Sequence, residues 1–235
     1  MSPVAQEGAQ GDPRLVIKDI PPVSEMGLNV EQPAIYYGEH NSDYKIVDTN
    51  VEELDYPRGD NNVYTHYQGT SGVGIGNFFS KLLFSWQFSD INILLTDYIN
   101  EDSKIIFWKR IKDRVNKIAP FLKLKDDPYL VLNEGKLYWM QDAYTTSPDY
   151  PYSEPYNNEY NYIRNSVKVV VDAYNGSVDF YTSDEDDPIL NVYRDIFPDM
   201  FKSMDEMPGT LRQHVRYPIH YFKAQIDKYN EYHMT

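Results

Sequence analysis

The chain has 235 residues, of which 41% are hydrophobic, so it is long enough to bury a core in one large domain or two small ones. Its formal net charge of −14 argues against nucleic-acid binding, which needs a basic surface to neutralise phosphates. The absence of cysteine excludes disulfides, thiolate nucleophiles and thiolate metal sites.

Neither a membrane span nor a signal peptide is predicted. The sequence has no run of about 18 apolar residues, and no basic region followed by an apolar one at its N-terminus. We therefore expect a soluble chain, and the abrupt ends at residues 1–8 and 232–235 suggest a piece of a longer protein.

The first 33 residues are expected to form an extended lead-in, because prolines and a glycine punctuate them. Residues 34–235 are expected to form a single α+β domain, with the division near residue 126 if it has two lobes. Short strands are predicted at residues 34–37, 44–48 and 62–67. The glycine-rich residues 69–76 lack the next glycine of a dinucleotide-binding fingerprint, since Asn77 stands there, and we interpret them as a flexible lead into a helix.

An apolar stripe marks this helix. Phe79, Leu82, Leu83 and Trp86 recur at helical spacing, and a second apolar segment extends to Leu95. Packing in the core is the simpler interpretation of the stripe, and contact with a membrane surface is the alternative.

A further helix is predicted at residues 103–119, ending before Pro120. Its apolar residues share one arc, and the cations lie mostly opposite; these are Lys109, Arg110, Arg114 and Lys117. A solvated face is the usual meaning of such charge. The functional interpretation is contact with an anionic lipid surface or with an acidic protein partner.

Two β-hairpins are predicted at the centre of the chain. The first joins residues 129–133 to 136–141 around Asn133-Glu134-Gly135, and the second joins residues 166–172 to 177–181 around Asn175-Gly176. The tyrosine-rich residues 142–155 between them contain too many prolines for a helix or a central strand, and are expected to form a loop.

Helices are predicted after the hairpins. Asp187 before Pro188 is typical of a helix N-terminus, so we expect a helix at residues 189–196 and a final helix at 219–232. The predicted fold class is α+β: antiparallel β-hairpins form a central sheet with amphipathic helices packed around it.

No complete catalytic motif, zinc-binding spacing or cofactor-binding motif is found, so no catalytic residue, metal or cofactor is predicted. The richest polar group leaves the first hairpin and enters the second; as ligand-binding candidates we expect Asp142, Tyr144, Arg164, Asn165 and Lys168 to cluster at one edge of the sheet. Carboxylates such as Asp142 and Asp172 could act in acid–base catalysis. The alternative is that these polar side chains only satisfy the backbone of turns and loops.

Several motifs resemble a known family: residues 127–131, 135–145, 150–153, 161–168, 171–174 and 217–235. They are similar to uncharacterised protein family zero-one-eight-two, which consists of large prokaryotic multi-spanning membrane proteins. The resemblance extends from about residue 18 to the last residue. It implies an internal soluble piece on the extracytoplasmic side, with the membrane part of its own full-length chain as a partner.

Two functions are therefore considered. The first is a non-catalytic extracytoplasmic domain that acts as a binding or assembly module. The alternative is a hydrolase or carbohydrate-active domain that uses a tyrosine-lined cleft and paired carboxylates.

Overall fold

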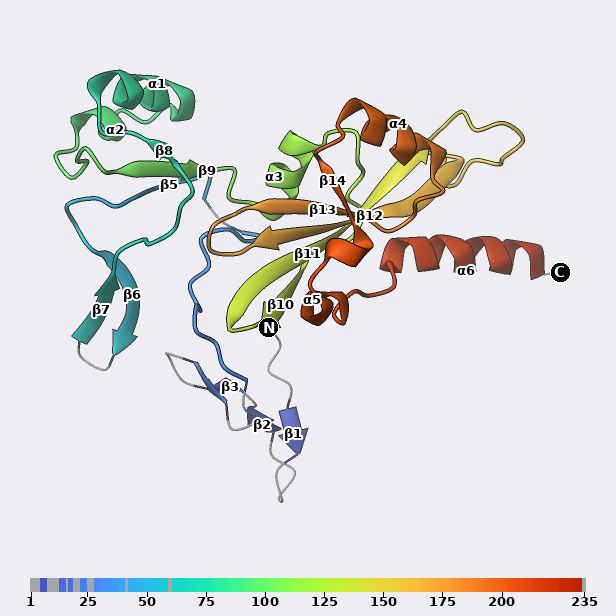
Figure 1. Cartoon of the computed structure of the whole chain (residues 1–235), viewed down its shortest axis with the longest axis horizontal. Coiled ribbons are helices and arrows are strands. Elements are labelled where there is room, and N and C mark those ends of the chain that lie inside the picture. The colour runs from blue at the N-terminus through green and yellow to red at the C-terminus, as the bar shows by residue number, and fades with distance from the viewer. Residues whose placement is uncertain are drawn as a thin grey trace. The chain divides into compact units, whose positions relative to one another are not determined.

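The computed structural model has the predicted α+β class (Figure 1). It describes residues 5–7, 13–15, 17–18, 22–24, 28–40, 42–58 and 61–233. In the lead-in, β1 (Ala5–Glu7) pairs with β2 (Pro13–Leu15), and β3 (Ile17–Lys18) pairs with β4 (Val23–Ser24). The rest of the expected extended conformation before residue 28 lies outside the described residues, apart from residue 22.

A five-stranded sheet holds the two predicted hairpins. Its strands are β10 (Tyr129–Asn133), β11 (Lys136–Ser147), β12 (Tyr162–Asp172), β13 (Val178–Thr182) and β14 (Phe201–Ser203), in that order. Neighbouring strands are antiparallel except β13 and β14, which are parallel. Both hairpins are confirmed, and Gly135 and Gly176 have the positive φ that their turns require.

The structure corrects the predicted loop between the hairpins. Residues 142–147 continue β11, because their backbone pairs with the start of β12, and only residues 148–161 form a loop. Ala143 pairs with Val167, whereas Thr145 pairs with Arg164, so β12 carries one extra residue here. Such a β-bulge changes the direction in which nearby side chains point.

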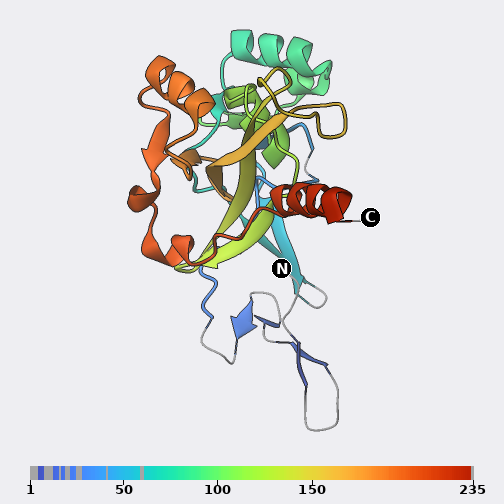
Figure 2. The same ribbon diagram turned by 90° about the vertical axis from the view of Figure 1, so that its right-hand side faces the viewer.

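Both faces of this sheet are covered by helices (Figure 2). The helices are α3 (Ile111–Ile118), α4 (Pro188–Ile196), α5 (Gly209–Arg212) and α6 (Ile219–His233), with a short 3-10 helix η1 (Met204–Glu206). Successive strand residues point to opposite faces. Tyr181 accordingly packs in a core with Met207 and Leu211, while Phe180 contacts Phe201 on the other face, at 6.0 Å between ring centroids.

The start of α4 confirms the predicted N-cap. Asp187 accepts a hydrogen bond from the Ile189 backbone N–H at 3.0 Å, and Pro188 is the first helical residue. The same buried carboxylate also accepts from Thr145, Ser166 and Tyr162. Asp187 therefore joins α4 to β11 and β12.

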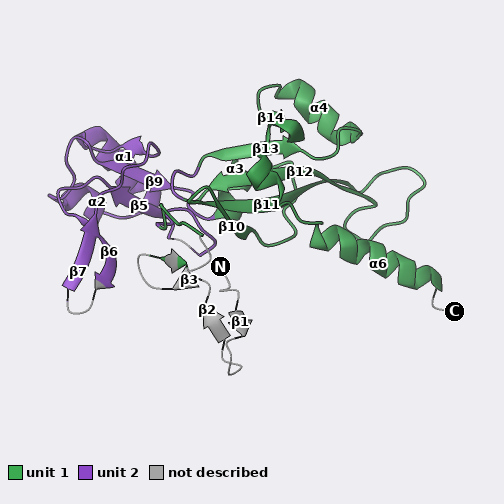
Figure 3. Cartoon of the chain, turned by 60° about the horizontal axis from the view of Figure 1, so that its bottom comes forward, with its two compact units in different colours: residues 1–33, 111–173, 177–235 green, residues 34–110, 174–176 purple. Residues whose placement is uncertain are grey.

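The chain divides into two compact units (Figure 3). Unit 1 contains residues 1–33, 111–173 and 177–235, and thus the five-stranded sheet; unit 2 contains residues 34–110 and 174–176. Residue 126, where the sequence suggested a division, lies within unit 1.

Unit 2 is built on a three-stranded sheet and two helices. β9 (Lys104–Phe107) lies between β5 (Tyr44–Val47) and β8 (Val73–Gly74), β6 (Glu53–Arg58) pairs with β7 (Asn61–Thr65), and the helices are α1 (Phe78–Phe88) and α2 (Asn92–Leu95). The strands predicted at 44–48 and 62–67 are confirmed in type, whereas residues 34–37 form no strand.

The prediction of a helix at residues 103–119 is wrong over its first half, where the structure has the strand β9. Ile105 and Ile106 are both buried, because β9 pairs with strands on either side. Trp108 then has a φ of 52°, which an α-helix cannot contain, so only α3 remains helical.

The turn after β12 completes unit 2. The backbone N–H of Gln68 donates to the Tyr174 hydroxyl at 2.9 Å, and that of Thr70 donates to Asn175 Oδ1 at 3.1 Å. Gly176 lies against the Tyr37 ring, where a Cβ atom would come within 2.4 Å of a ring carbon. No helix among the described residues is long and apolar enough to cross a membrane.

Candidate functional site

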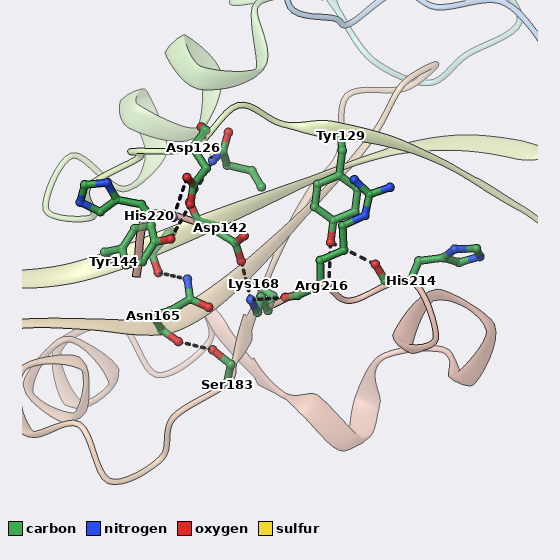
Figure 4. Close-up of polar contacts among 12 residues, drawn as sticks. Asp126, Tyr129, Asp142, Tyr144, Asn165, Lys168, Ser183, His214, Arg216 and His220 are labelled. Atoms are coloured by element: carbon green, nitrogen blue, oxygen red, sulfur yellow. Dashed lines mark hydrogen bonds and ion pairs between the residues drawn. The ribbon is translucent and has the colours of Figure 1, made fainter. Parts of the chain in front are cut away.

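A buried ion pair lies at the centre of the predicted site (Figure 4). Asp142 on β11 faces Lys168 on β12 in the strand register, and Lys168 Nζ contacts Asp142 Oδ1. Each residue is only 6% exposed. Lys168 Nζ also donates to the Arg216 backbone carbonyl at 3.2 Å. Burial raises the pKa of Asp142 despite the opposing effect of the Lys168 charge.

A second polar group near this pair is centred on Asp126 and includes Tyr144. The buried Tyr144 hydroxyl donates to Asp126 Oδ2 at 2.5 Å, and Asp126 Oδ1 accepts from the His220 backbone N–H at 3.0 Å. Gln141 donates to the Asp126 carbonyl at 3.0 Å. Burial, with a further contribution from Asp126, raises the pKa of Tyr144, so the phenol stays protonated at neutral pH. Both oxygens of Asp126 are thus occupied by protein donors.

Asn165 and Arg164 lie at the β-bulge. The Asn165 side chain donates to the Ala143 backbone carbonyl at 3.3 Å, and the Asn165 backbone carbonyl accepts from the Ser183 hydroxyl at 2.7 Å. Arg164 forms an ion pair with Asp184 at 2.9 Å. The five candidates lie on β11 and β12, which are central strands and not an edge of the sheet. Asp142 and Lys168 contact each other, whereas Arg164 is in register with Thr145 and pairs with Asp184. Asp172, the other predicted carboxylate, pairs with Tyr138 nearer the far end of the strands.

Sequence reasoning missed Asp126 and His220. His220 Nε2 hydrogen-bonds to the Tyr160 hydroxyl at 2.6 Å, and burial lowers the pKa of the imidazole. These residues lie far apart in the chain and belong to no recognisable motif, so no local signal could have joined them.

A groove lies beside the ion pair. It has a volume of about 440 Å³ and is bordered by Arg164, Asn165 and Lys168 on the sheet side, and by residues 215–218 and Tyr221 on the other. Lys168 is poorly placed to attract an anionic ligand into this groove, because Asp142 already neutralises its charge.

A second groove, here called the tyrosine groove, has a volume of about 490 Å³. It lies between the 148–161 loop, the start of β12 and α6, and six tyrosines line it: Tyr150, Tyr156, Tyr160, Tyr162, Tyr221 and Tyr232. Arg164 and Tyr221 border both grooves. Glu154 is the one carboxylate among the described residues that line the tyrosine groove. This lining thus lacks the pair of carboxylates that most glycosidases use.

The four cations predicted to share a helical face do not share one. Lys109 precedes α3 and is buried, with its Nζ donating to Ser42 at 3.2 Å, and burial lowers its pKa. Arg110 pairs with Asp43 at 3.1 Å. Only Arg114 and Lys117 belong to α3, and they lie in unit 1 while the other two lie in unit 2. Helical periodicity predicted a shared face wrongly here, because α3 begins at Ile111 and does not include Lys109 or Arg110.

The apolar stripe on α1 is exposed, so its interpretation as core packing is wrong in the part of the chain that the structure describes. Phe79 is 67% exposed and Trp86 81%, and Leu82 and Leu83 are also exposed. Other residues of the helix, Phe84 and Phe88, pack on the core of unit 2 instead. This surface is named the α1 stripe below: Phe79, Leu82, Leu83 and Trp86.

Among the described residues, no group of three or more acidic or histidine side chains is placed to bind a metal ion.

Comparisons with known proteins identify one family. The family model described as "Uncharacterised protein family (UPF0182)" matches residues 1–235. A UPF0182 protein of Pelotomaculum thermopropionicum is 51% identical over 234 residues, and one of Desulforamulus reducens is 51% identical over 237. One of Trichodesmium erythraeum is 46% identical over 254. These alignments cover all of this chain but only 26%, 25% and 28% of the respective relatives. No solved structure matches the chain.

Proposed function

This chain belongs to uncharacterised protein family UPF0182 and spans about a quarter of the length of its relatives, and from that premise we propose that it is a non-catalytic binding and assembly domain of a larger protein. The proposed setting is the extracytoplasmic side of a prokaryotic membrane, attached to the membrane part of the same full-length chain. The resemblance of its motifs to large multi-spanning membrane proteins supports this setting.

The α1 stripe carries the proposal. Apolar side chains that are exposed singly are common on folded proteins, whereas a contiguous exposed apolar patch marks an interaction site. Its side chains stand at positions i, i+3, i+4 and i+7 of one helix and therefore lie side by side. Fully burying an apolar side chain of this size contributes about 1.5–3 kcal/mol, so covering the stripe would stabilise an assembly substantially.

The proposed occupant of the stripe is the remainder of the same polypeptide. About three quarters of each aligned relative lies outside the matched region, which supplies ample chain to cover one helix face. An anionic lipid surface fits less well. The net charge is −14, acidic residues follow the helix at Asp90, Asp97, Glu101 and Asp102, and the expected cationic face is not assembled.

The polar cluster supports the non-catalytic part of the proposal. Asp142 is neutralised by Lys168, and Asp126 has both oxygens occupied. Both carboxylates contact protein groups, and neither is among the described residues that line the two grooves. The alternative of a glycosidase-like hydrolase therefore lacks a pair of carboxylates in the described lining of the tyrosine groove.

Photo-cross-linking in the full-length protein tests the assembly. A photoreactive amino acid replaces Trp86, and the matched control replaces Tyr229, which is 64% exposed on α6. We expect Trp86 to yield intramolecular cross-links to segments outside these 235 residues, identified by mass spectrometry. Cross-links to lipid alone would assign the stripe to the membrane. No more cross-linking than at Tyr229 would leave the stripe without a partner, and either result would overturn the proposed assembly.

The membrane side is tested separately. Protease added to intact spheroplasts should cleave an epitope-tagged 148–161 loop in the full-length protein, as it would any extracytoplasmic segment. Protection until the membrane is lysed would contradict the proposed setting.

A further inference from the structure

We propose that the tyrosine groove binds an uncharged carbohydrate. This inference goes beyond the proposed assembly and concerns a different surface, since the groove lies in unit 1 and the α1 stripe lies in unit 2. Its volume of about 490 Å³ is within the range of ligand pockets, about 300–1,000 Å³.

Three tyrosine rings of the groove are fixed through their hydroxyls. Tyr156 donates to Asp227 at 2.6 Å, Tyr162 donates to Asp187 at 2.6 Å, and the Tyr160 hydroxyl is 2.6 Å from His220 Nε2. Rings held in this way lose little conformational entropy when a ligand binds. They are therefore positioned in advance of binding.

The loop that carries the groove is also held in place. Asn161 accepts from the Tyr150 backbone N–H at 2.8 Å and donates to the Tyr150 carbonyl at 2.7 Å. Ser153 donates to the Asn161 carbonyl at 2.7 Å, and a bridge between Tyr156 and Tyr160 closes the loop further on. One asparagine thus spans the loop and fixes the side chains that it presents.

Aromatic surface remains available to a ligand. Tyr150 stacks on Tyr162 with ring centroids 4.8 Å apart and is still 45% exposed. Tyr232 enters the groove from α6 and is 72% exposed. The C–H faces of a sugar ring are apolar and flat enough to lie on such rings, while its hydroxyls need hydrogen-bonding partners. The exposed hydroxyls of Tyr150 and Tyr232 and the amide nitrogen of Gln225, whose oxygen accepts from Tyr217 at 2.7 Å, supply such partners among the lining residues.

The charges in the groove are balanced, which selects for a neutral ligand. Glu154 pairs with Lys228 at 3.3 Å, and Arg164 pairs with Asp184 at 2.9 Å. An anionic ligand such as a phosphate or a nucleotide would have to displace a carboxylate from its cation. A proline-rich peptide also docks on aromatic grooves. The hydrogen-bonding groups interspersed among the rings favour a ligand with hydroxyls at its rim over one with an apolar ridge.

Binding of neutral oligosaccharides to the 235-residue chain tests the inference. The probes are cello-, malto-, xylo- and chito-oligosaccharides of four to six sugars, with a ten-residue polyproline peptide as comparator, and affinity is measured by calorimetry. We expect at least one oligosaccharide to bind, and Tyr150→Ala and Tyr232→Ala each to weaken it about tenfold. Because the groove charges are balanced, the affinity should not change when salt is raised to about 0.5 M.

Matched variants on the same two elements serve as controls. Tyr152 lies in the same loop and Tyr229 on the same helix, and neither lines the groove. Tyr152→Ala and Tyr229→Ala should leave the affinity unchanged. All four positions are exposed, so folding is retained and near-ultraviolet circular dichroism verifies it.

Three results would overturn the inference: no oligosaccharide binding at millimolar concentration, equal loss in the control variants, or binding of the polyproline peptide alone. None of these changes the expected cross-linking at Trp86, so the assembly and the carbohydrate site fail or succeed independently.

Discussion

Replacing Lys168 by methionine should destabilise unit 1 strongly, because it leaves the Asp142 carboxylate buried without its cation. Removing one partner of a buried ion pair costs about 3–5 kcal/mol. At about 2–4 °C per kcal/mol for a chain of this size, the melting transition of unit 1 should fall by about 6–20 °C at pH 7. Urea unfolding followed by tyrosine fluorescence measures the free energy.

The pH dependence gives a second, independent readout. Burial raises the pKa of Asp142 above its ordinary value of 3.8, against the effect of Lys168. A carboxyl whose folded-state pKa is raised contributes most to stability below its unfolded pKa, and that contribution declines as pH rises through the folded pKa. Without Lys168 the pKa of Asp142 should rise further. The Lys168→Met variant should therefore recover part of its lost stability as the pH is lowered from 7 toward 5.

Two further variants test the reasoning. Adding Asp142→Leu to Lys168→Met removes both charges and should restore most of the stability, since replacing a buried pair by apolar residues is often neutral or stabilising. Lys202 forms an exposed pair with Asp179 at 2.7 Å on the same sheet, and Lys202→Met should cost no more than about 1 kcal/mol. If Lys168→Met is as mild as Lys202→Met, the Asp142 carboxylate is solvated and the argument fails.

Other variants test the scaffold of each unit. Burial acts to raise the pKa of Asp187, but its hydrogen bonds, led by the one from Ser166, hold the pKa below the ordinary value of 3.8. The Asp187 carboxylate therefore stabilises the fold above pH 3.8, and this stabilisation is lost as the pH falls through the folded-state pKa. Asp187→Asn should cost about 1–3 kcal/mol at pH 7 and less in acid, and an unchanged acid profile in urea titrations would contradict this. Gly176→Ala should destabilise the protein by more than about 1 kcal/mol in thermal unfolding, because Gly176 has a φ of 68° and lies against the Tyr37 ring. Gly209 in α5 has open space around it, so Gly209→Ala should be neutral or stabilising by up to about 1 kcal/mol. Equal effects of the two substitutions would refute the steric argument.

The hairpins could be predicted because their signals are local. Asn175-Gly176 specifies a tight turn by itself, and the alternating apolar residues on either side determine the register. Asp187 before Pro188 is equally local, since a helix N-terminus is satisfied within three residues.

Elements that depend on distant partners could not be predicted. The isoleucines at 105 and 106 suit a strand, but the cations around them have a helical period, and only the pairing with β5 and β8 decides between the two. The contact of Asp142 with Lys168 joins two of the predicted candidates, whereas the contact of Asp126 with the backbone of His220 spans 94 residues and had no local signal. Helical periodicity predicted a face on α1 but contains no information about what covers that face.

The turn at residues 174–176 has a consequence for the order of synthesis and folding. These residues belong to unit 2, yet the ribosome makes them only after β10, β11 and β12. At about 5–20 residues per second, residues 34–110 wait on the order of several seconds for the hydrogen bonds to Gln68 and Thr70. A nascent chain that stops after Arg110 lacks the segment that completes its first-made unit. Until Gly176 is made, residues 34–110 lack these hydrogen bonds and the packing of Gly176 against Tyr37, so we expect unit 2 to be most prone to aggregation in that interval.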